Sequence, residues 1–231
     1  MNNLVETQIK KYIKNKRIKD RLILSESFGM KCEKISLENN ETFVAKYYQE
    51  KNIFFNSIVS EVNSLKYLIQ KFPTLFPEIK YHSNDLLIID YINHNNIKNA
   101  DYQKILASEI LKLHQITSDK YGFEFDAQIG GLKQSNVFDT NWVNFFREKR
   151  LNMIFEKINK EDPMPKEIND KIEKLIKDLN NRIPNTTRIS LLHGDLWEGN
   201  ILFHDGKLVG LIDPGIYFGH NELEIAYLTW F

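Results

Sequence analysis

A short polar segment between two apolar runs constrains this chain more than any other feature. Residues 191–203 read LLHGDLWEGNILF, and the cluster His193 to Asn200 holds an imidazole, two carboxylates, a carboxamide and two glycines. Apolar runs bounded by turn residues are typical of buried strands. A purely structural turn needs one Gly or Asn rather than this set. The segment therefore predicts a loop that brings several polar side chains together between two buried strands.

The hydrophobic pattern divides the chain into two parts that differ in predicted secondary structure. The first ninety residues are predicted to be mostly strand around one main helix, and the remainder mostly helix, with a polar connector near residues 92–99. The fold class is therefore α+β, with a sheet-rich lobe over residues 1–91 and a larger helical lobe over residues 92–231. The expected strands are 21–25, 31–37, 41–48, 78–83, 86–92 and 207–213. The expected helices are 3–15, 54–71, 100–116 and 166–181. Two further helices are expected, one that begins after a cap at Asp139 or Thr140 and one from about residue 220.

Charge and cysteine content limit the classes of partner. Lys and Arg number 31, as do Asp and Glu, so the zero net charge indicates neither a nucleic-acid partner nor a membrane surface. The longest apolar runs are far too short to span a bilayer. Cys32 is the only cysteine, which excludes an internal disulfide, and it is expected to be a small buried residue. We expect a cytoplasmic protein.

Three polar residues in the last third of the chain have a spacing typical of kinases. Asn200 follows Asp195 by five positions, and Asp213 comes thirteen later at the end of the apolar run LVGLI. In the kinase catalytic loop an Asp accepts the hydroxyl proton and an Asn five positions later binds magnesium. Either aspartate alone would be interpreted as a turn former. Together the three predict a catalytic Asp195 with Asn200 and Asp213 as ligands of Mg²⁺, which prefers oxygen.

The first lobe contains candidates for the residues that hold nucleotide phosphates. Lys46 lies inside the apolar strand TFVAKYY, and Glu61 follows fifteen residues later on the next predicted helix. Kinases pair a strand lysine with a helical glutamate in this way, although either residue alone would be expected on a solvated face. The segment SESFGMK offers only Gly29 for a loop over the phosphates, where kinases use several glycines.

Three segments resemble the fructosamine kinase (ketosamine 3-kinase) family of aminoglycoside phosphotransferase-like kinases. LLHGDLWEGNILF is similar to the family's HGDLWxGN signature, and LIDPGIYFGHNELEIAYLTWF to IDPAxYxGHRExDLAxxxLF, with Gly215 for Ala, Asn221 for Arg and Glu224 for Asp. The segment 113–151 also fits. It carries the family positions Gly122, Phe123, Ile129, Gly130, Gln134, Asn136, Trp142, Phe145, Phe146, Arg150 and Leu151.

The resemblance implies a two-lobed protein-kinase-like fold that binds ATP and Mg²⁺ in its cleft. The implied reaction is phosphorylation of a sugar hydroxyl on a ketoamine adduct, free or protein-bound. By motif, Asp195 is the base and Lys46, held by Glu61, contacts the phosphates. Asp90 and Ile92 of the connector contact adenine through their backbone, and the residues implied near the sugar are Trp197, His220 and Glu222.

Two alternatives stay open at the level of sequence. One is a related kinase for an aminoglycoside or choline-like substrate, and the other is a truncated kinase fold without turnover. Family members usually continue beyond the position of residue 231, and the last five residues here include Tyr227, Leu228, Trp230 and Phe231. Because such an apolar end favours burial, we expect partial burial and a tendency to form a homodimer. We also expect impaired activity, because the family's further helices would wall the substrate side.

Overall fold

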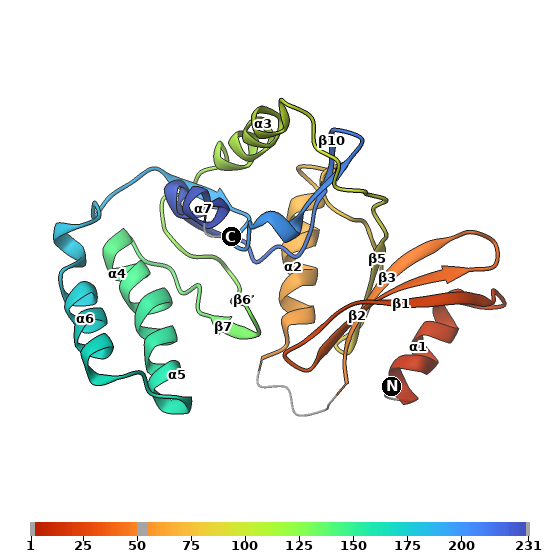
Figure 1. Ribbon diagram of the computed structural model, residues 1–231, viewed down its shortest axis with the longest axis horizontal. Helices are drawn as coiled ribbons and strands as arrows, with labels where there is room; N and C mark the ends of the chain where they lie inside the picture. The colour runs from red at the N-terminus through yellow and green to blue at the C-terminus, as the bar shows by residue number, and fades with distance from the viewer. Residues whose placement is uncertain (1–2, 50–54, 230–231) are drawn as a thin grey trace.

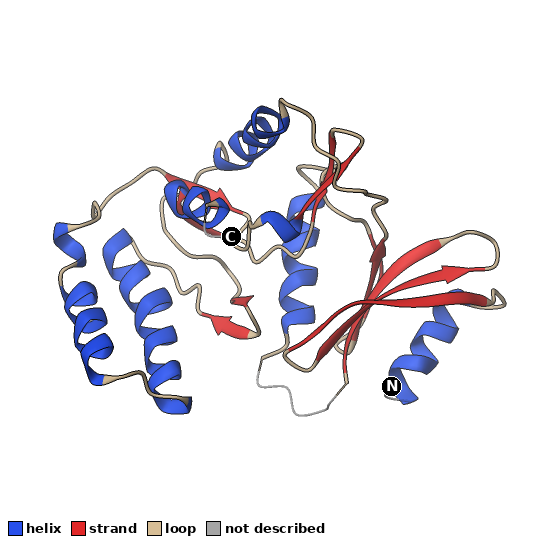
Figure 2. Ribbon diagram, viewed as in Figure 1, coloured by secondary structure: helices blue, strands red, loops and turns tan. Residues whose placement is uncertain are grey.

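The computed structural model describes residues 3–49 and 55–229. A strongly twisted sheet with helix α1 (Asn3–Ile13) lies at one end of the molecule, and the helices α5 (Met153–Glu161) and α6 (Lys166–Lys177) lie at the other (Figures 1 and 2). Trp230 and Phe231, on which the expectation of a self-associating chain end partly rests, lie outside the described residues. No helix within the described ranges is long and apolar enough to cross a membrane.

A five-stranded antiparallel sheet forms the first lobe. Its strands lie in the order β1-β2-β3-β5-β4. They are β1 (Ile18–Ser27), β2 (Met30–Leu37), β3 (Thr42–Tyr48), β4 (Ile79–His82) and β5 (Leu86–Asp90). The central strand β3 is buried at every position after Thr42, because both faces of the sheet are covered. The strands predicted from sequence for this lobe are confirmed, and β2 with β3 and β4 with β5 form antiparallel pairs.

The alternation of side chains along β3 divides the lobe between two helices. Phe43, Ala45 and Tyr47 join the apolar cluster beneath α1, whereas Val44 and Tyr48 join the cluster around α2 (Ser57–Ile69). Lys46 is two residues from both Val44 and Tyr48, so its side chain points to the same face of the sheet as theirs, the face toward α2. The period of the sheet thus places this lysine beside the helix that carries the predicted glutamate.

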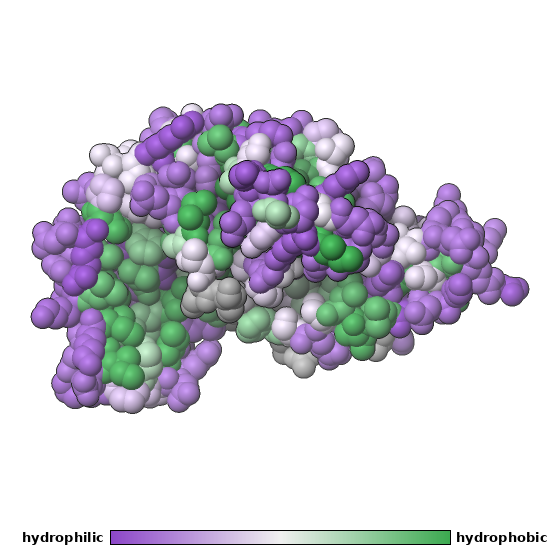
Figure 3. Space-filling model, turned by 45° about the horizontal axis from the view of Figure 1, so that its top comes forward, coloured by the Kyte–Doolittle hydropathy of each residue, from purple (hydrophilic) through white to green (hydrophobic). Residues whose placement is uncertain are grey.

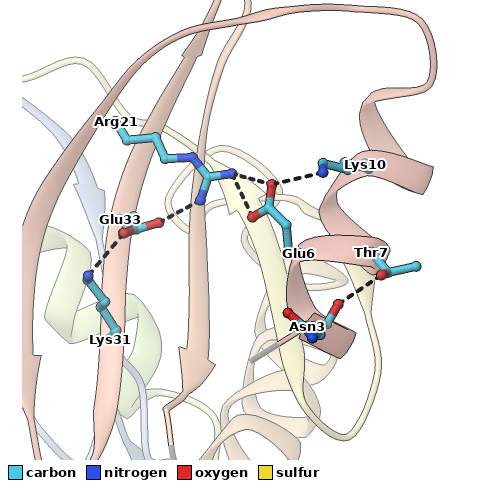
Figure 4. Close-up of polar contacts among 7 residues, drawn as sticks. All are labelled: Asn3, Glu6, Thr7, Lys10, Arg21, Lys31 and Glu33. Atoms are coloured by element: carbon cyan, nitrogen blue, oxygen red, sulfur yellow. Dashed lines mark hydrogen bonds and ion pairs between the residues drawn. The ribbon is translucent and has the colours of Figure 1, made fainter. Parts of the chain in front are cut away.

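Helix α1 is tied to the edge of the sheet by a small polar network (Figure 4). Arg21 of β1 donates two hydrogen bonds to the carboxylate of Glu6, at 2.9 and 3.1 Å, and one to Glu33 at 3.4 Å. Partly exposed ion pairs contribute about 0–1 kcal/mol each. The apolar side chains of Val5, Ile9 and Ile13, all buried, therefore hold α1 against the sheet more strongly than the charges do.

The second lobe is built from helices and short two-stranded ribbons. Its helices are α3 (Tyr102–His114), α4 (Trp142–Phe146) with a π-helical continuation Arg147–Asn152 into α5, α6, and α7 (Asn221–Leu228). Its ribbons are β6 (Ala127–Ile129) with β7 (Leu132–Gln134), β8 (Ile189–Leu192) with β11 (Tyr217–His220), and β9 (Ile201–His204) with β10 (Lys207–Leu211). One apolar core joins α2 to this lobe, since Leu65 and Leu68 share a cluster with Phe145, Leu191 and Phe203.

Several details of the second lobe differ from the sequence-based expectation. The helix start after residue 140 is capped by Asn141, whose side chain accepts from the N–H of Asn144, and not by Asp139 or Thr140. Residues 117–138, for which no strand is predicted from sequence, contain the β6–β7 hairpin. The segment ahead of α7 forms strand β11. Three-residue strands and a strand of four residues carry too little alternation for a periodic pattern to detect.

Figure 3 shows apolar side chains gathered over α5 and α6. Ile158, Ile168 and Leu175 are exposed there, and α5 buries none of its side chains. A helix pair with amphipathic sequence normally covers its apolar stripe against another element. Within the described ranges, this stripe remains largely open to solvent.

Candidate active site

Lys46, Glu61 and Asp213 meet at the back of the interlobe cleft. The ammonium of Lys46 donates a 2.6 Å hydrogen bond to Glu61 and a second hydrogen bond to Asp213 from the other lobe. Lys46 and Glu61 are both buried, and burial alone would lower the pKa of Lys46. The carboxylates of Asp213 and Glu61 outweigh that effect and raise this pKa, so the lysine stays charged. Burial raises the pKa of Glu61, and the charge of Lys46 opposes that rise.

The loop after β8 carries Asp195 and Asn200 into the same cleft. The amide nitrogen of Asn200 donates to the backbone oxygen of Asp195 at 2.7 Å and to its carboxylate at 3.2 Å. Burial and the nearby charge of Asp213 raise the pKa of Asp195 to about 6, against the opposing effects of Asn200 and Lys46. Asp195 is therefore mostly ionised near neutral pH and still close enough to its pKa to accept a proton, as a general base requires.

His193 belongs to the packing of this loop and not to its chemistry. Its side chain is fully buried and stacks on Phe76, with ring centroids 6.1 Å apart. Burial lowers the pKa of His193, so the ring is neutral. The imidazole in the polar cluster thus anchors the loop, while Asp195 and Asn200 face the cleft.

Two hydrogen bonds fix the backbone ahead of Asp195. The N–H of Gly215 donates to the carbonyl of His193, and the N–H of Gly194 donates to the carboxylate of Glu224, both at 2.9 Å. Gly194 has φ +86°, and a Cβ there would lie 2.0 Å from the carbonyl oxygen of Gly215. Only glycine fits this close approach of two backbone segments.

Glu224 is buried and uses both carboxylate oxygens. One oxygen accepts from Gly194, and the other lies 2.8 Å from Nε2 of His114 on α3. The single side chain thereby links helix α7, helix α3 and the loop that carries Asp195. A buried carboxylate is stable only when it is paired and hydrogen-bonded in this way.

The cleft between the lobes has a volume of about 1070 Å³. Pockets that bury one drug-sized ligand measure about 300–1,000 Å³, so this cleft has room for a nucleotide and a small acceptor. Its lining includes all the residues predicted for catalysis, phosphate contact, metal ligation and adenine contact except Glu61. These are Asp195, Lys46, Gly29, Asn200, Asp213, Asp90 and Ile92. Glu61 lies behind Lys46 and accepts a hydrogen bond from its ammonium.

The connector side of the cleft suits a flat apolar ring. Val44, Ile89, Leu202 and Ile212 line it from both lobes. The carbonyl oxygen of Ile92 accepts a 2.9 Å hydrogen bond from Nδ1 of His94 and keeps a second lone pair for a ligand.

The roof of the cleft is the β1–β2 hairpin, which turns through only Phe28 and Gly29. Cys32 of β2 lies opposite Lys46 in the strand register and also lines the cleft. Burial raises the pKa of the Cys32 thiol to about 11. The thiol is therefore protonated near neutral pH, which favours a packing role.

The far side of the cleft, beyond Asp195, is bounded by Trp197, Ile154 and Tyr227. Of the three residues predicted near the sugar, only Trp197 lines the cleft. His220 packs near Trp142, with ring centroids 6.1 Å apart, and Glu222 is an exposed residue of the first turn of α7. The helical period explains this placement, because the face of α7 that carries Glu224 and Tyr227, three residues apart, is turned toward the loop and the cleft.

The donor set fits a magnesium ion bound together with a nucleotide. No group of three or more His, Cys, Asp or Glu side chains that could hold a metal occurs among residues 3–49 and 55–229. Asp213 and Asn200 supply one carboxylate and one amide oxygen in the cleft. Mg²⁺ in kinase sites needs only one or two such protein oxygens, with phosphates and water completing its coordination. Asn200 and Asp213 are thus the residues that would hold it.

The fructosamine kinase family model matches residues 1–231. This chain belongs to the fructosamine kinase family. A protein of Vibrio cholerae named as a ketoamine kinase is 27% identical over 227 residues, which cover 90% of this chain and 77% of that protein. The chloroplastic protein-ribulosamine 3-kinase of Arabidopsis thaliana is 31% identical over 147 residues, which cover 62% of this chain but 44% of that protein.

Solved structures show that this fructosamine kinase family member has the protein-kinase-like fold. A protein of Thermobifida fusca described as a fructosamine-3-kinase superposes with a TM-score of 0.83 at 18% identity, over 99% of this chain and 78% of that one. An ADP-bound aminoglycoside phosphotransferase superposes with a TM-score of 0.65 at 21% identity, over 97% of this chain and 74% of that one. The predicted two-lobed α+β fold is confirmed.

The sequence reasoning missed two residues of this family member's site, Glu224 and Tyr227. Both lie in the helix LEIAYL. The position of Glu224 between the apolar residues Leu223 and Ile225 was a signal that its carboxylate is buried and paired with another group. Their partners are distant in sequence, and no local spacing reveals them.

Proposed function

We propose that this chain transfers the γ-phosphoryl group of ATP to a hydroxyl of a ketoamine sugar, such as a fructosamine or ribulosamine. The observation that carries the proposal is the Lys46 ammonium held between Glu61 and Asp213 in the cleft that Asp195 faces. Family membership and the names of the relatives support a ketoamine as acceptor.

In the proposed reaction, the carboxylate of Asp195 accepts the proton of the acceptor hydroxyl. The hydroxyl oxygen forms a bond to the γ-phosphorus while the bond from that phosphorus to the bridging oxygen breaks, which leaves ADP. Lys46 balances charge on the phosphates, and Glu61 orients Lys46. A magnesium ion, held by Asn200 and Asp213, would supply charge neutralisation for the phosphates.

The aromatic side chains near Asp195 support an acceptor that presents a sugar ring and an alkyl stem. Trp197 and Tyr227 line this end of the cleft, and Trp197 is 37% exposed, so its face is accessible. The secondary amine of a ketoamine is largely protonated near neutral pH. Among the carboxylates that line the cleft, Asp195 is the one whose charge acts on Tyr227, so it is the candidate partner of the amine.

Magnesium-dependent ATP consumption with synthetic ribulosyl-lysine and fructosyl-lysine tests the proposal. We expect formation of ADP and a phosphorylated ketoamine, and loss of both by several powers of ten in Asp195→Asn, which removes the proton acceptor. Turnover of choline or an aminoglycoside with none on ketoamines would overturn the substrate assignment. Nucleotide binding without transfer to any acceptor would show a non-catalytic kinase fold.

A further inference from the structure

The tip of the β1–β2 hairpin has an unusual backbone conformation. Its two turn residues, Phe28 and Gly29, have φ of +50° and +73°. A two-residue hairpin of this kind is normally made by Asn, Asp or Gly, because positive φ is unfavourable for other side chains. A bulky residue in this region costs on the order of 1–3 kcal/mol and persists where the surroundings demand it. We therefore expect contacts of the Phe28 side chain to offset the free-energy cost of this conformation.

A second two-residue hairpin meets this tip from across the cleft. The turn of β6–β7 consists of Gly130 and Gly131, both at positive φ, and the two hairpin tips lie close together at the lower centre of Figure 1. A Cβ on Gly131 would lie 2.5–2.9 Å from Cγ, Cβ and Cδ1 of Phe28. Phe28 thus rests directly on the bare backbone of the Gly130–Gly131 turn.

The β6–β7 hairpin is anchored at its base. The hydroxyl of Ser60 on α2 donates to the carbonyl of Asp126 at 3.0 Å, and the N–H of Asn136 donates to the Asp126 carboxylate at 2.9 Å. Gln134 and Asn136 are buried at the end of the hairpin. The Gly130–Gly131 turn is therefore held in place from its base. The β1–β2 tip contacts this turn through the side chain of Phe28.

We propose that Phe28 is a positioning residue that closes the β1–β2 loop against the Gly130–Gly131 turn over the phosphate end of the cleft. The inference rests on the proposed kinase function. Phe28, Gly130 and Gly131 all line the cleft that contains Lys46 and Asp213. Closure at this point holds the loop on the phosphates and keeps water from reaching the γ-phosphoryl group. A single glycine in the loop then suffices, because the contact with the turn supplies the closure.

A purely structural role for Phe28 does not fit its exposure. The residue is 70% exposed despite the contact with the turn. A ring this exposed contributes little to the free energy of unfolding by burial. Removal of the ring should therefore change nucleotide kinetics with little change in the melting temperature.

The first experiment measures dissociation of a fluorescent ATP analogue by stopped flow in Phe28→Ala, which keeps the backbone strain and loses the ring. We expect roughly 3- to 10-fold faster dissociation, the size of one lost aromatic contact, and restoration in Phe28→Tyr. Ile23→Ala is the control, because it removes an exposed apolar side chain of the adjoining strand β1 that does not line the cleft. It should leave dissociation unchanged. Wild-type dissociation in Phe28→Ala would overturn the proposal.

The second experiment approaches the contact from the other lobe. Gly131→Ala adds a methyl group that collides with Phe28, whereas in Gly130→Ala the methyl group lies 3.7–3.9 Å from the ring, an ordinary contact. Both glycines have positive φ, so the two variants share the backbone strain. We expect faster dissociation in Gly131→Ala than in Gly130→Ala, and no such difference when Phe28→Gly is also present. Equal effects in both backgrounds would contradict the contact.

A third readout separates this inference from the proposed function. With ketoamine and ATP present, Phe28→Ala should raise the ratio of ATP hydrolysed by water to ketoamine phosphorylated. If no ketoamine is phosphorylated by the wild type, the function fails, yet the acceptor-independent dissociation rates still decide whether Phe28 closes the loop. An unchanged ratio in an active enzyme would remove the water-shielding role.

Discussion

The carboxylate of Glu224 accepts a 2.9 Å hydrogen bond from the backbone N–H of Gly194, the residue immediately before Asp195. Glu224 lies thirty residues further along the chain, on α7, and its second oxygen is held by His114 of α3. The position of the proposed base is therefore fixed by a side chain that does not line the main cleft. A small shift of a positioned catalytic group can cost about 10²-fold in rate.

Glu224→Ala should lower kcat for ketoamine phosphorylation by about 10²-fold and leave the KM for ATP nearly unchanged. The variant leaves the N–H of Gly194 and the ring of His114 without their partner, which costs roughly 1–3 kcal/mol of stability. Glu224→Gln retains a carbonyl oxygen for Gly194, so it should recover most of kcat. Steady-state kinetics and thermal unfolding measure the two effects. An equal loss in Gln and Ala would show that the charge matters more than the hydrogen bond.

Lys46→Met should lower kcat/KM for ATP by about 10²–10³-fold, because the phosphates lose their buried cation. Glu61 is then left without its cation, and burial already raises its pKa, so it takes up a proton and the fold survives. Lys31→Met serves as the control, since Lys31 pairs with Glu33 at 3.3 Å in the same sheet but does not line the cleft. Steady-state kinetics with varied ATP gives the comparison, and comparable losses in both variants would contradict the role of Lys46.

The pH dependence of the reaction should report on Asp195. Its pKa is raised to about 6 by burial and by Asp213, so kcat/KM for the acceptor should fall as the pH drops through about 6. Measurement of initial rates between pH 5 and 8 at saturating ATP gives the profile. A flat profile through this range would argue against Asp195 as the base.

The raised pKa of Asp195 also means that its ionised carboxylate lowers the free energy of unfolding. Its pKa in the folded state, about 6, exceeds the ordinary value of 3.8, so the folded state binds more protons than the unfolded state between these values. The free energy of unfolding therefore falls as the pH rises through this window, and the cost is complete above it. Asp195→Asn removes the charge and should stabilise the fold at pH 7 by roughly 1–3 kcal/mol while abolishing transfer. Urea unfolding at pH 7 and pH 4.5 tests this, because the gain should shrink at the lower pH.

The parts of the site that sequence could predict are those set by local spacing and by period. Asp195 and Asn200 share one loop, and the kinase pattern of a strand lysine and a helical glutamate paired Lys46 with Glu61. Contacts between segments that are far apart in the chain leave no spacing or periodic pattern in the sequence. The hydrogen bond from Gly194 to Glu224 and the contact of Phe28 with Gly131 depend on how separate hairpins and helices pack, which no short window of residues contains.

Tyr227 should control the choice of acceptor. It lies one helical turn after Glu224 on α7 and lines the cleft beyond Asp195. Burial raises the pKa of Tyr227 to about 12, so its phenol stays neutral and can donate a hydrogen bond to a sugar hydroxyl near neutral pH.

Tyr227→Ala should raise the KM for the ketoamine roughly 10-fold, the equivalent of about 1.4 kcal/mol, with little change in the KM for ATP. Tyr227→Phe keeps the ring and removes only the hydroxyl, so its KM for the ketoamine should lie between the values of the wild type and of Tyr227→Ala. Ile225→Ala is the matched control, because Ile225 is an exposed residue of the same helix that does not line the cleft. Kinetics with ribulosyl-lysine and with the shorter ribulosyl-glycine locate the contact. If Tyr227 packs on the sugar, both acceptors lose equally, whereas a contact with the lysine stem penalises only the longer one. An unchanged KM for both acceptors in Tyr227→Ala would place the acceptor elsewhere in the cleft.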